Sequence, residues 1–167
     1  MQAELAKRFA ALEKRRIALV KRVKALPAET QVTKRSAAEF SPAEMIMHMA
    51  ITEHGNLVFL QKTPLSALKG KTPKTTFFFK GTVAKMQDPT KPTPTLPFMI
   101  PKGPVDVDVA AQSWEAARSQ IRGYLEKAES PEAAFIKFHF VFGTASASDL
   151  LDLLEAHTTY HEKRFPA

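Results

Sequence analysis

The sequence predicts an all-α protein: a four-helix bundle formed by one domain that spans residues 1–167. Four segments carry apolar residues at helical spacing, and no long alternating strand pattern interrupts them. The segment 62–107 between the second and third helices holds eight of the twelve prolines, so we expect an extended crossover there. A connection of this length can return across the bundle and give its helices an up-down-down-up order.

The first helix is predicted over residues 3–26, and Pro27 closes it. One face is apolar, with lysines and arginines opposite, and consists of Leu5, Phe9, Leu12, Leu19, Val23 and Leu26. The second helix is predicted to begin at the sequence SPAE, where Ser41 is the N-cap and Glu44 completes a capping box. We expect it to continue to about Leu60.

The remaining segments differ in how clearly they predict structure. The stretch TTFFFKGTVAK at 75–85 is compatible with a strand pair or a helical turn. A third helix is predicted from Asp108, as N-cap, to about Ala128, with an apolar face of Val109, Trp114, Ala117, Ile121 and Leu125. A fourth begins at Ser146, with Asp149 three residues on, and its apolar face is Leu150, Leu153, Leu154, Tyr160 and Phe165.

Composition excludes several function classes. The chain has no cysteine, which rules out disulfides, thiolate metal sites and a cysteine nucleophile, so any thiol chemistry needs an external thiol. No apolar run approaches a membrane span and the N-terminus is unlike a signal peptide, so we expect a cytoplasmic protein without membrane contact. The net charge of +7 is concentrated in residues 1–26 and 62–102. Neither segment interleaves arginines with aromatic residues, which disfavours nucleic-acid binding.

The sequence HTTYH places His157 and His161 four residues apart, which is one helical turn. His157 follows the leucines of the fourth helix by three, four and seven residues, so the pair is expected to point into the bundle. His48 lies between methionines on an inward face of the second helix. The three imidazoles could bind one cation if these two helices are antiparallel; the alternative is a hydrogen-bonded pair in the core.

Other polar residues near these positions have simpler explanations. Glu53 and His54 are expected to face solvent, because His54 lies about 240° around the helix from His48. His139 stands in an apolar run, where packing or a backbone hydrogen bond explains it. Glu155 and Glu162 flank the histidine pair and are expected to face partly outward, so no general base is evident.

Two segments carry a resemblance to a known family. FSPAEMIMHMAITE (40–53) and HFVFGTASASDLLDLLEAHTTYH (139–161) are similar to the DinB-like superfamily. The resemblance implies a four-helix bundle of up-down-down-up order. It also implies a divalent metal, zinc or nickel, held by His48, His157 and His161. The chain departs from the usual pattern in having a phenylalanine instead of a tryptophan before the Ser-Pro start, and in its longer proline-rich insert.

Three neutral imidazoles leave coordination positions open, which is typical of catalytic metal sites. Such a metal would activate water or hold an external low-molecular-weight thiol, as in relatives that use bacillithiol or mycothiol. We therefore expect a metal-dependent enzyme, a transferase or hydrolase, acting on a small-molecule substrate. The alternative is a non-catalytic, stress-associated binding bundle in which the metal is structural. The crossover could cover the pocket or form a homodimer.

Overall fold

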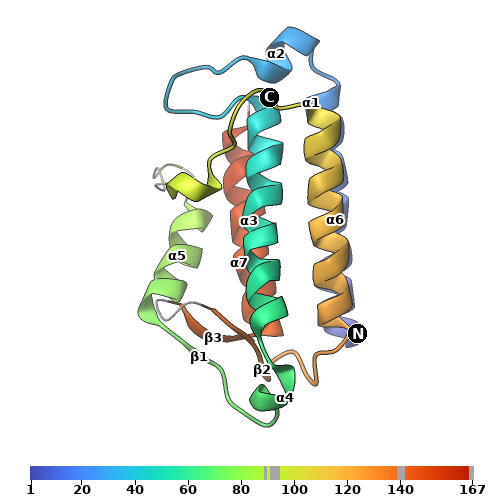
Figure 1. The fold of residues 1–167 in the computed structure, drawn as a ribbon, viewed down its shortest axis with the longest axis vertical. Helices are drawn as coiled ribbons and strands as arrows, with labels where there is room; N and C mark the ends of the chain where they lie inside the picture. The colour runs from blue at the N-terminus through green and yellow to red at the C-terminus, as the bar shows by residue number, and fades with distance from the viewer. Residues whose placement is uncertain (89, 91–94, 139–141, 166–167) are drawn as a thin grey trace.

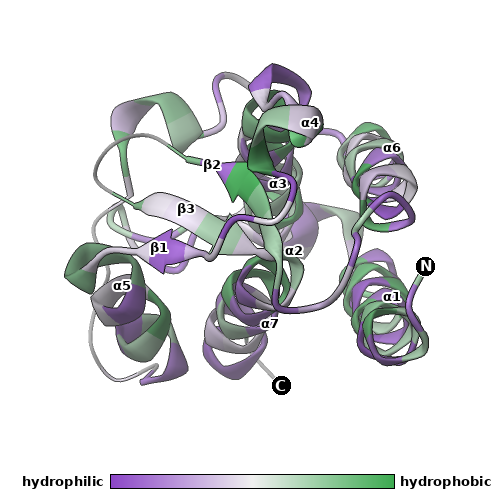
Figure 2. Cartoon of the chain, turned by 90° about the horizontal axis from the view of Figure 1, so that it is seen from below, coloured by the Kyte–Doolittle hydropathy of each residue, from purple (hydrophilic) through white to green (hydrophobic). Residues whose placement is uncertain are grey.

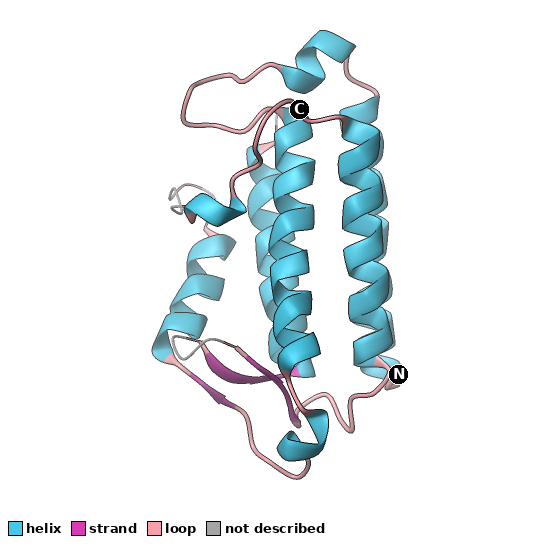
Figure 3. Ribbon diagram, in the orientation of Figure 1, coloured by secondary structure: helices cyan, strands magenta, loops and turns pink. Residues whose placement is uncertain are grey.

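Four long helices dominate the computed structural model, which describes residues 1–88, 90, 95–138 and 142–165 (Figures 1 and 3). The chain is mostly helical, as predicted, and it adds a small sheet that was not predicted. The elements in chain order are α1 (Ala3–Lys24), α2 (Ala28–Val32), α3 (Pro42–Lys62), α4 (Leu65–Leu68), β1 (Lys74–Thr75), α5 (Phe77–Gln87), the 3-10 helix η1 (Pro97–Met99), α6 (Val107–Leu125), β2 (Ala134–Lys137), β3 (Gly143–Ser146) and α7 (Ala147–Arg164).

The long helices lie side by side along the long axis of the molecule. In the orientation of Figure 1, α1 and α7 run upwards, whereas α3 and α6 run downwards. The view from below shows the four helix ends at the corners of a square, with α5 outside it next to α7 (Figure 2). The first turns of α3 and the last turns of α7 are therefore at the same level.

Local sequence fixes where the helices begin. Ser41 and Ser146 each cap a helix through a reciprocal capping box, as predicted, with Glu44 and Asp149 as the partners. The predicted start of the third long helix was wrong by two residues. Asp106, not Asp108, accepts the backbone N–H of Val109, because a cap must precede the first helical residue. Val109 is accordingly exposed, and α6 ends at Leu125, before Ala128.

The crossover is more structured than an extended connection. The stretch 75–85, left open between strand and helix, enters the helix α5, where Thr76 caps the first turn. The preceding β1 joins a three-stranded antiparallel sheet of order β1-β3-β2, which lies at the lower end of the long helices in Figure 1. These strands contain only two to four residues. Such short strands carry no alternating pattern long enough to predict a sheet from the sequence.

Gly143 begins the middle strand with a φ of +80°, in a region that residues with a side chain rarely adopt. A Cβ atom at this position would also lie 2.3 Å from the carbonyl oxygen of Lys74 on the neighbouring strand. Glycine is thus required twice, for the backbone angle and for the close approach of β1. The resulting sheet joins the crossover to the start of α7.

The core confirms the predicted apolar faces of α1 and α7. Their buried members are Leu5, Phe9, Leu12, Leu19, Val23, Leu150, Leu153, Leu154, Tyr160 and Phe165. One difference lies on α1: Arg16, expected on the solvated side, is only 6% exposed and pairs with Glu13. Arg16 is part of a network of charged side chains that also includes Glu13 and the buried pair of Glu53 and Arg118.

Candidate metal centre

The structure brings together the three histidines that the sequence singled out. Nε2 of His48, from the second turn of α3, lies 3.2 Å from Nε2 of His157 near the end of α7. Nε2 of His161, one turn later, lies 3.1 Å from the same atom. Each of the three residues is less than a tenth exposed, and one nitrogen from each lies within 4.8 Å of the others. Three imidazoles therefore converge on one point inside the molecule.

A hydrogen bond to the crossover determines which ring nitrogen of His48 carries the proton. Nδ1 of His48 lies 2.9 Å from the carbonyl oxygen of Met99, in η1. A carbonyl can only accept, so Nδ1 must be the atom that carries the proton. In the neutral ring, Nε2 then has a free lone pair that points at the other histidines.

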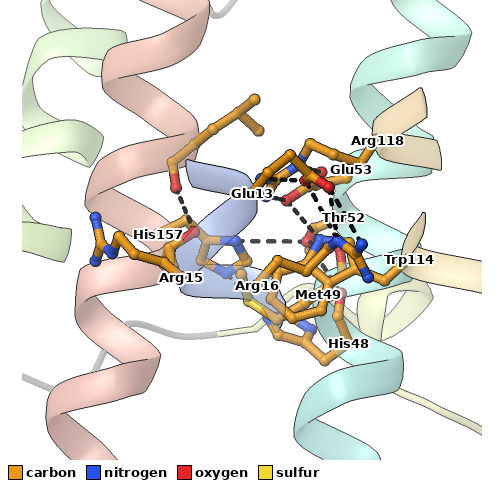
Figure 4. Close-up of polar contacts among 12 residues, drawn as sticks. Glu13, Arg15, Arg16, His48, Met49, Thr52, Glu53, Trp114, Arg118 and His157 are labelled. Atoms are coloured by element: carbon orange, nitrogen blue, oxygen red, sulfur yellow. Dashed lines mark hydrogen bonds and ion pairs between the residues drawn. The ribbon is translucent and has the colours of Figure 1, made fainter. Parts of the chain in front are cut away.

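A contact with Thr52 favours the same tautomer in His157. The hydroxyl of Thr52 donates to the carbonyl oxygens of His48 and Met49, both at 3.0 Å. The same oxygen can therefore accept a hydrogen bond from Nδ1 of His157, which lies 3.5 Å away. Figure 4 shows this contact as a dashed line. This longer contact favours the tautomer with a proton on Nδ1. Nε2 of His157 is then also an acceptor.

This pattern of protons fits a metal ion. Nε2 of His48 and Nε2 of His157 face each other with lone pairs, and neither can donate a hydrogen bond to the other. Such a contact is unfavourable unless a cation lies between the two atoms. Zinc–nitrogen bonds place two ligand nitrogens of a tetrahedral site about 3.3 Å apart, close to the separations found here. The three residues could therefore hold a divalent metal.

The surroundings keep the imidazoles neutral. Burial, reinforced by His48 and the cationic Arg118, lowers the pKa of His157 to about 3. The pKa of His161 is lowered mainly by burial, and then by its two histidine neighbours and Arg164. Burial also lowers the pKa of His48, although the hydrogen bond to Met99 opposes this. A proton is thus a poor occupant at neutral pH, and the rings are in the form that binds metals.

A cavity of about 290 Å³ opens beside the three histidines. Its walls come from α3 and α7, from α5 and η1 of the crossover, and from the segment before β3. The lining residues are His48, Thr52, Asn56, Thr82, Met86, Thr95, Leu96, Met99, Phe142, Leu153, Leu154, His157, Tyr160 and His161. The crossover therefore forms one wall of the cavity. We call this space the histidine cavity.

A model of the DinB superfamily matches residues 11–163. The chain belongs to the DinB superfamily. No curated protein and no solved structure gives a significant match. The family resemblance expected from the second helix and the C-terminal helix is thereby confirmed. Within the described ranges, no helix is both long and apolar enough to cross a membrane.

Phe40, where the DinB-like pattern usually has tryptophan, contacts the site directly. Its ring centroid lies 4.9 Å from that of His48, with the two planes tilted by 31°. Phe40 therefore supplies an aromatic contact to one ring of the site. Together with the Met99 carbonyl, it limits the rotation of His48.

The predicted exposure of Glu53 was wrong, because its side chain is only 1% exposed. Its carboxylate accepts from Trp114 Nε1 at 2.7 Å and from Arg118 Nε at 2.6 Å. Arg118 also contacts Glu13, which in turn pairs with Arg16, so the charges are balanced (Figure 4). Glu53 lies on a different face of α3 from His48, as predicted, but α6 covers that face. The low charge content of α3 is the signal that indicated burial on more than one side.

The other polar residues that the sequence placed near the histidines lie in different surroundings. His54 is exposed, as predicted. Glu155 and Glu162 are half-buried and pair with the α1 residues Arg8 and Arg15, so they stabilise the contact of α1 with α7. His139 lies outside the described residues. Tyr160 is buried, as its place on the predicted apolar face implied, and it also lines the histidine cavity.

Proposed function

We propose that His48, His157 and His161 bind one divalent metal ion, zinc or nickel, and that the protein is a metal-dependent enzyme of the DinB superfamily. The observation that carries the proposal is the 3.2 Å approach of Nε2 of His48 to Nε2 of His157. In the tautomers that the Nδ1 contacts of these two rings favour, neither atom has a proton to share. When bound, such an ion supplies a Lewis acid that lowers the pKa of a water or thiol donor.

The up-down-down-up order of a four-helix bundle is part of this proposal. His48 is in the second turn of α3, whereas His157 and His161 are in the last two turns of α7. They meet because these two helices run in opposite directions in Figure 1. In an up-down-up-down bundle the same residues would be displaced along the axis by about 9 Å, which no single ion could bridge.

The cavity supports a reactive site over a purely structural ion. A structural zinc site is closed by four protein ligands, whereas three leave a position for a substrate atom. The histidines line a cavity that is large enough for a small molecule. Met99 and Thr52 would orient two of the rings, and the remaining walls would position the substrate. We propose a transferase that uses an external low-molecular-weight thiol, or a hydrolase.

Metal analysis of protein purified without a histidine tag tests the site. We expect stoichiometric zinc or nickel in the wild type and its loss in His48→Ala and His157→Ala. His54→Ala, which removes an exposed histidine from the same helix as His48, is the matched control and keeps the metal. Absence of metal from every preparation, including protein incubated with zinc or nickel, contradicts the proposal.

A second experiment separates an enzyme from the non-catalytic alternative. The metal-loaded protein is assayed with thiol cosubstrates and with simple esters. Turnover that disappears in His157→Ala, while the helical content is retained, supports an enzyme. If the metal binds but neither class of substrate is turned over, a binding protein with a structural metal is favoured.

A further inference from the structure

We infer that Asn56 of α3 binds the substrate directly, and that it recognises a group that both donates and accepts a hydrogen bond, such as an amide. The inference rests on the proposed function, because another atom of the same molecule would take the open position on the metal. It goes further in naming a binding residue and the chemical group that this residue selects.

Asn56 lines the histidine cavity on the same side of α3 as two residues of the metal centre. His48, Thr52 and Asn56 follow each other at intervals of four residues, so their side chains form one row along the helix. The two ends of this row are separated by a rise of about 12 Å along the helix axis. Asn56 is therefore at a distance from the metal that a small molecule can span.

The carboxamide of Asn56 is available to a ligand. Its atoms form no hydrogen bond with any part of the chain that the structure describes. The hydroxyl of Thr52, one turn earlier, is by contrast bonded to two backbone carbonyls and contacts His157. An asparagine side chain has two N–H donors and an oxygen with two lone pairs, so Asn56 can both donate and accept.

The facing helix offers this carboxamide no polar partner. Because α7 runs antiparallel to α3, the level of Asn56 on α7 comes about two turns before the histidine pair. The α7 residues that line the cavity nearest to this level are Leu153 and Leu154. Asn56 is only partly buried, so water can bond to it until a ligand enters.

The other polar residues of the lining have different roles. The three histidines face the metal, Thr52 is bonded as described, and Tyr160 is buried against the ring of the last histidine. Thr82 and Thr95 belong to the crossover, and each has a single hydroxyl oxygen. Among the described lining residues, Asn56 alone has a donor and an acceptor on two neighbouring atoms of one plane, the geometry that pairs with an amide.

The metal and Asn56 then bind opposite ends of one ligand. The positive charge of the ion attracts the donor atom of the ligand, such as a thiolate sulfur, to the histidine end of the cavity. At the other end the ligand displaces water from Asn56. An amide restores the lost hydrogen bonds, whereas an apolar group leaves the carboxamide without a partner. A ligand with an amide at this end is therefore favoured.

The test uses zinc-loaded protein and two probes of the same shape. 6-Mercaptohexanamide has a thiol for the metal and an amide for Asn56, and 6-methylheptane-1-thiol has an isopropyl group in place of the amide. Isothermal titration calorimetry measures both dissociation constants. We expect Asn56→Leu to weaken binding of the amide by about tenfold and not to weaken binding of the apolar thiol. Equal affinity of wild type and variant for the amide, or no binding of the amide to the wild type, overturns the inference.

Gln61→Leu is the matched control variant. It removes a carboxamide from the same helix, at an exposed position that does not line the cavity, and should leave both affinities unchanged. Urea denaturation distinguishes binding from a structural role. Asn56 has no described partner and leucine has the higher helix propensity, so Asn56→Leu should be at least as stable as the wild type. A less stable variant with unchanged amide binding would show that Asn56 is structural.

A second measurement does not depend on the metal. Asn56 is the only asparagine in the sequence, so the loss of one pair of side-chain amide signals in ¹H–¹⁵N NMR spectra of Asn56→Leu identifies it. We expect hexanamide, which lacks the thiol, to shift these signals in metal-free protein. If it does so while no preparation binds zinc or nickel, the metal proposal fails and the role of Asn56 holds. If zinc binds but neither amide probe depends on Asn56, the opposite conclusion follows.

Discussion

The carbonyl oxygen of Met99 accepts a hydrogen bond of 2.9 Å from Nδ1 of His48, although 51 residues separate them in the chain. This bond joins the crossover to the centre of the proposed metal site. It directs the lone pair of Nε2 at His157, so the folding of the crossover and the arrangement of the site depend on each other.

Loosening η1 should therefore weaken metal binding. Pro97 begins η1 and restricts its backbone, so we expect Pro97→Gly to lower the affinity for zinc by about tenfold, as for other lost outer contacts of a ligand. Competition with a chromophoric chelator measures this. Pro104→Gly changes an exposed proline of the same crossover and should bind as the wild type does. Equal affinities in the two variants would show that η1 does not orient His48.

Removing the charge of Glu53 should destabilise the protein strongly. Among the described residues, Glu53→Gln leaves the buried Arg118 with the partly exposed Glu13 as its one remaining carboxylate partner. Breaking a buried ion pair on one side costs about 3 kcal/mol or more in the free energy of unfolding. Urea denaturation measures the loss. Glu39→Gln removes the exposed pair with Arg35, which contributes about 1 kcal/mol at most. Similar losses in both variants would contradict a special role for the buried network.

The three-histidine arrangement could be predicted because its signals are local. The spacing of His157 and His161 put them on one face, and the preceding leucines gave that face its direction. The Met99 carbonyl could not be predicted, because every residue has a carbonyl and only the folded crossover selects one. That the three residues bind a metal stays a prediction.

The fold was predictable to a similar extent. Helices with capping boxes and regular apolar spacing had reliable starts, as at Ser41 and Ser146. Glu53 was misplaced because we assumed that α3 has one buried face, whereas α6 and α7 cover it from two sides. The helix α5 remained undecided because Gly81, Thr82 and Val83 have low helix propensity, and packing against α7 decides its conformation.

Acid should destabilise the metal-free protein through His157. Its pKa is about 3 in the folded state and near 6.5 when unfolded, so the unfolded state binds a proton that the folded state does not. Stability contributed by this group is present above pH 6.5 and is lost as the pH falls toward 3. The maximum slope for one residue is about 1.4 kcal/mol per pH unit. Urea denaturation between these pH values should show a smaller loss in His157→Gln than in the wild type. Parallel curves would contradict the burial of a neutral ring.

The junction between the crossover and α7 should be the position least tolerant of a methyl group. Gly143→Ala forces alanine to a φ of +80° and brings its Cβ against the carbonyl oxygen of Lys74, so the middle strand must shift away from β1. We expect the free energy of unfolding to fall by about 2 kcal/mol or more. Gly70→Ala is the matched control, since Gly70 has a φ of +68° but no atom near the added group. It should lose only the part that comes from backbone strain, about 1 kcal/mol. Thermal and urea denaturation of both variants give the comparison, and equal losses would show that the close approach of Lys74 contributes nothing.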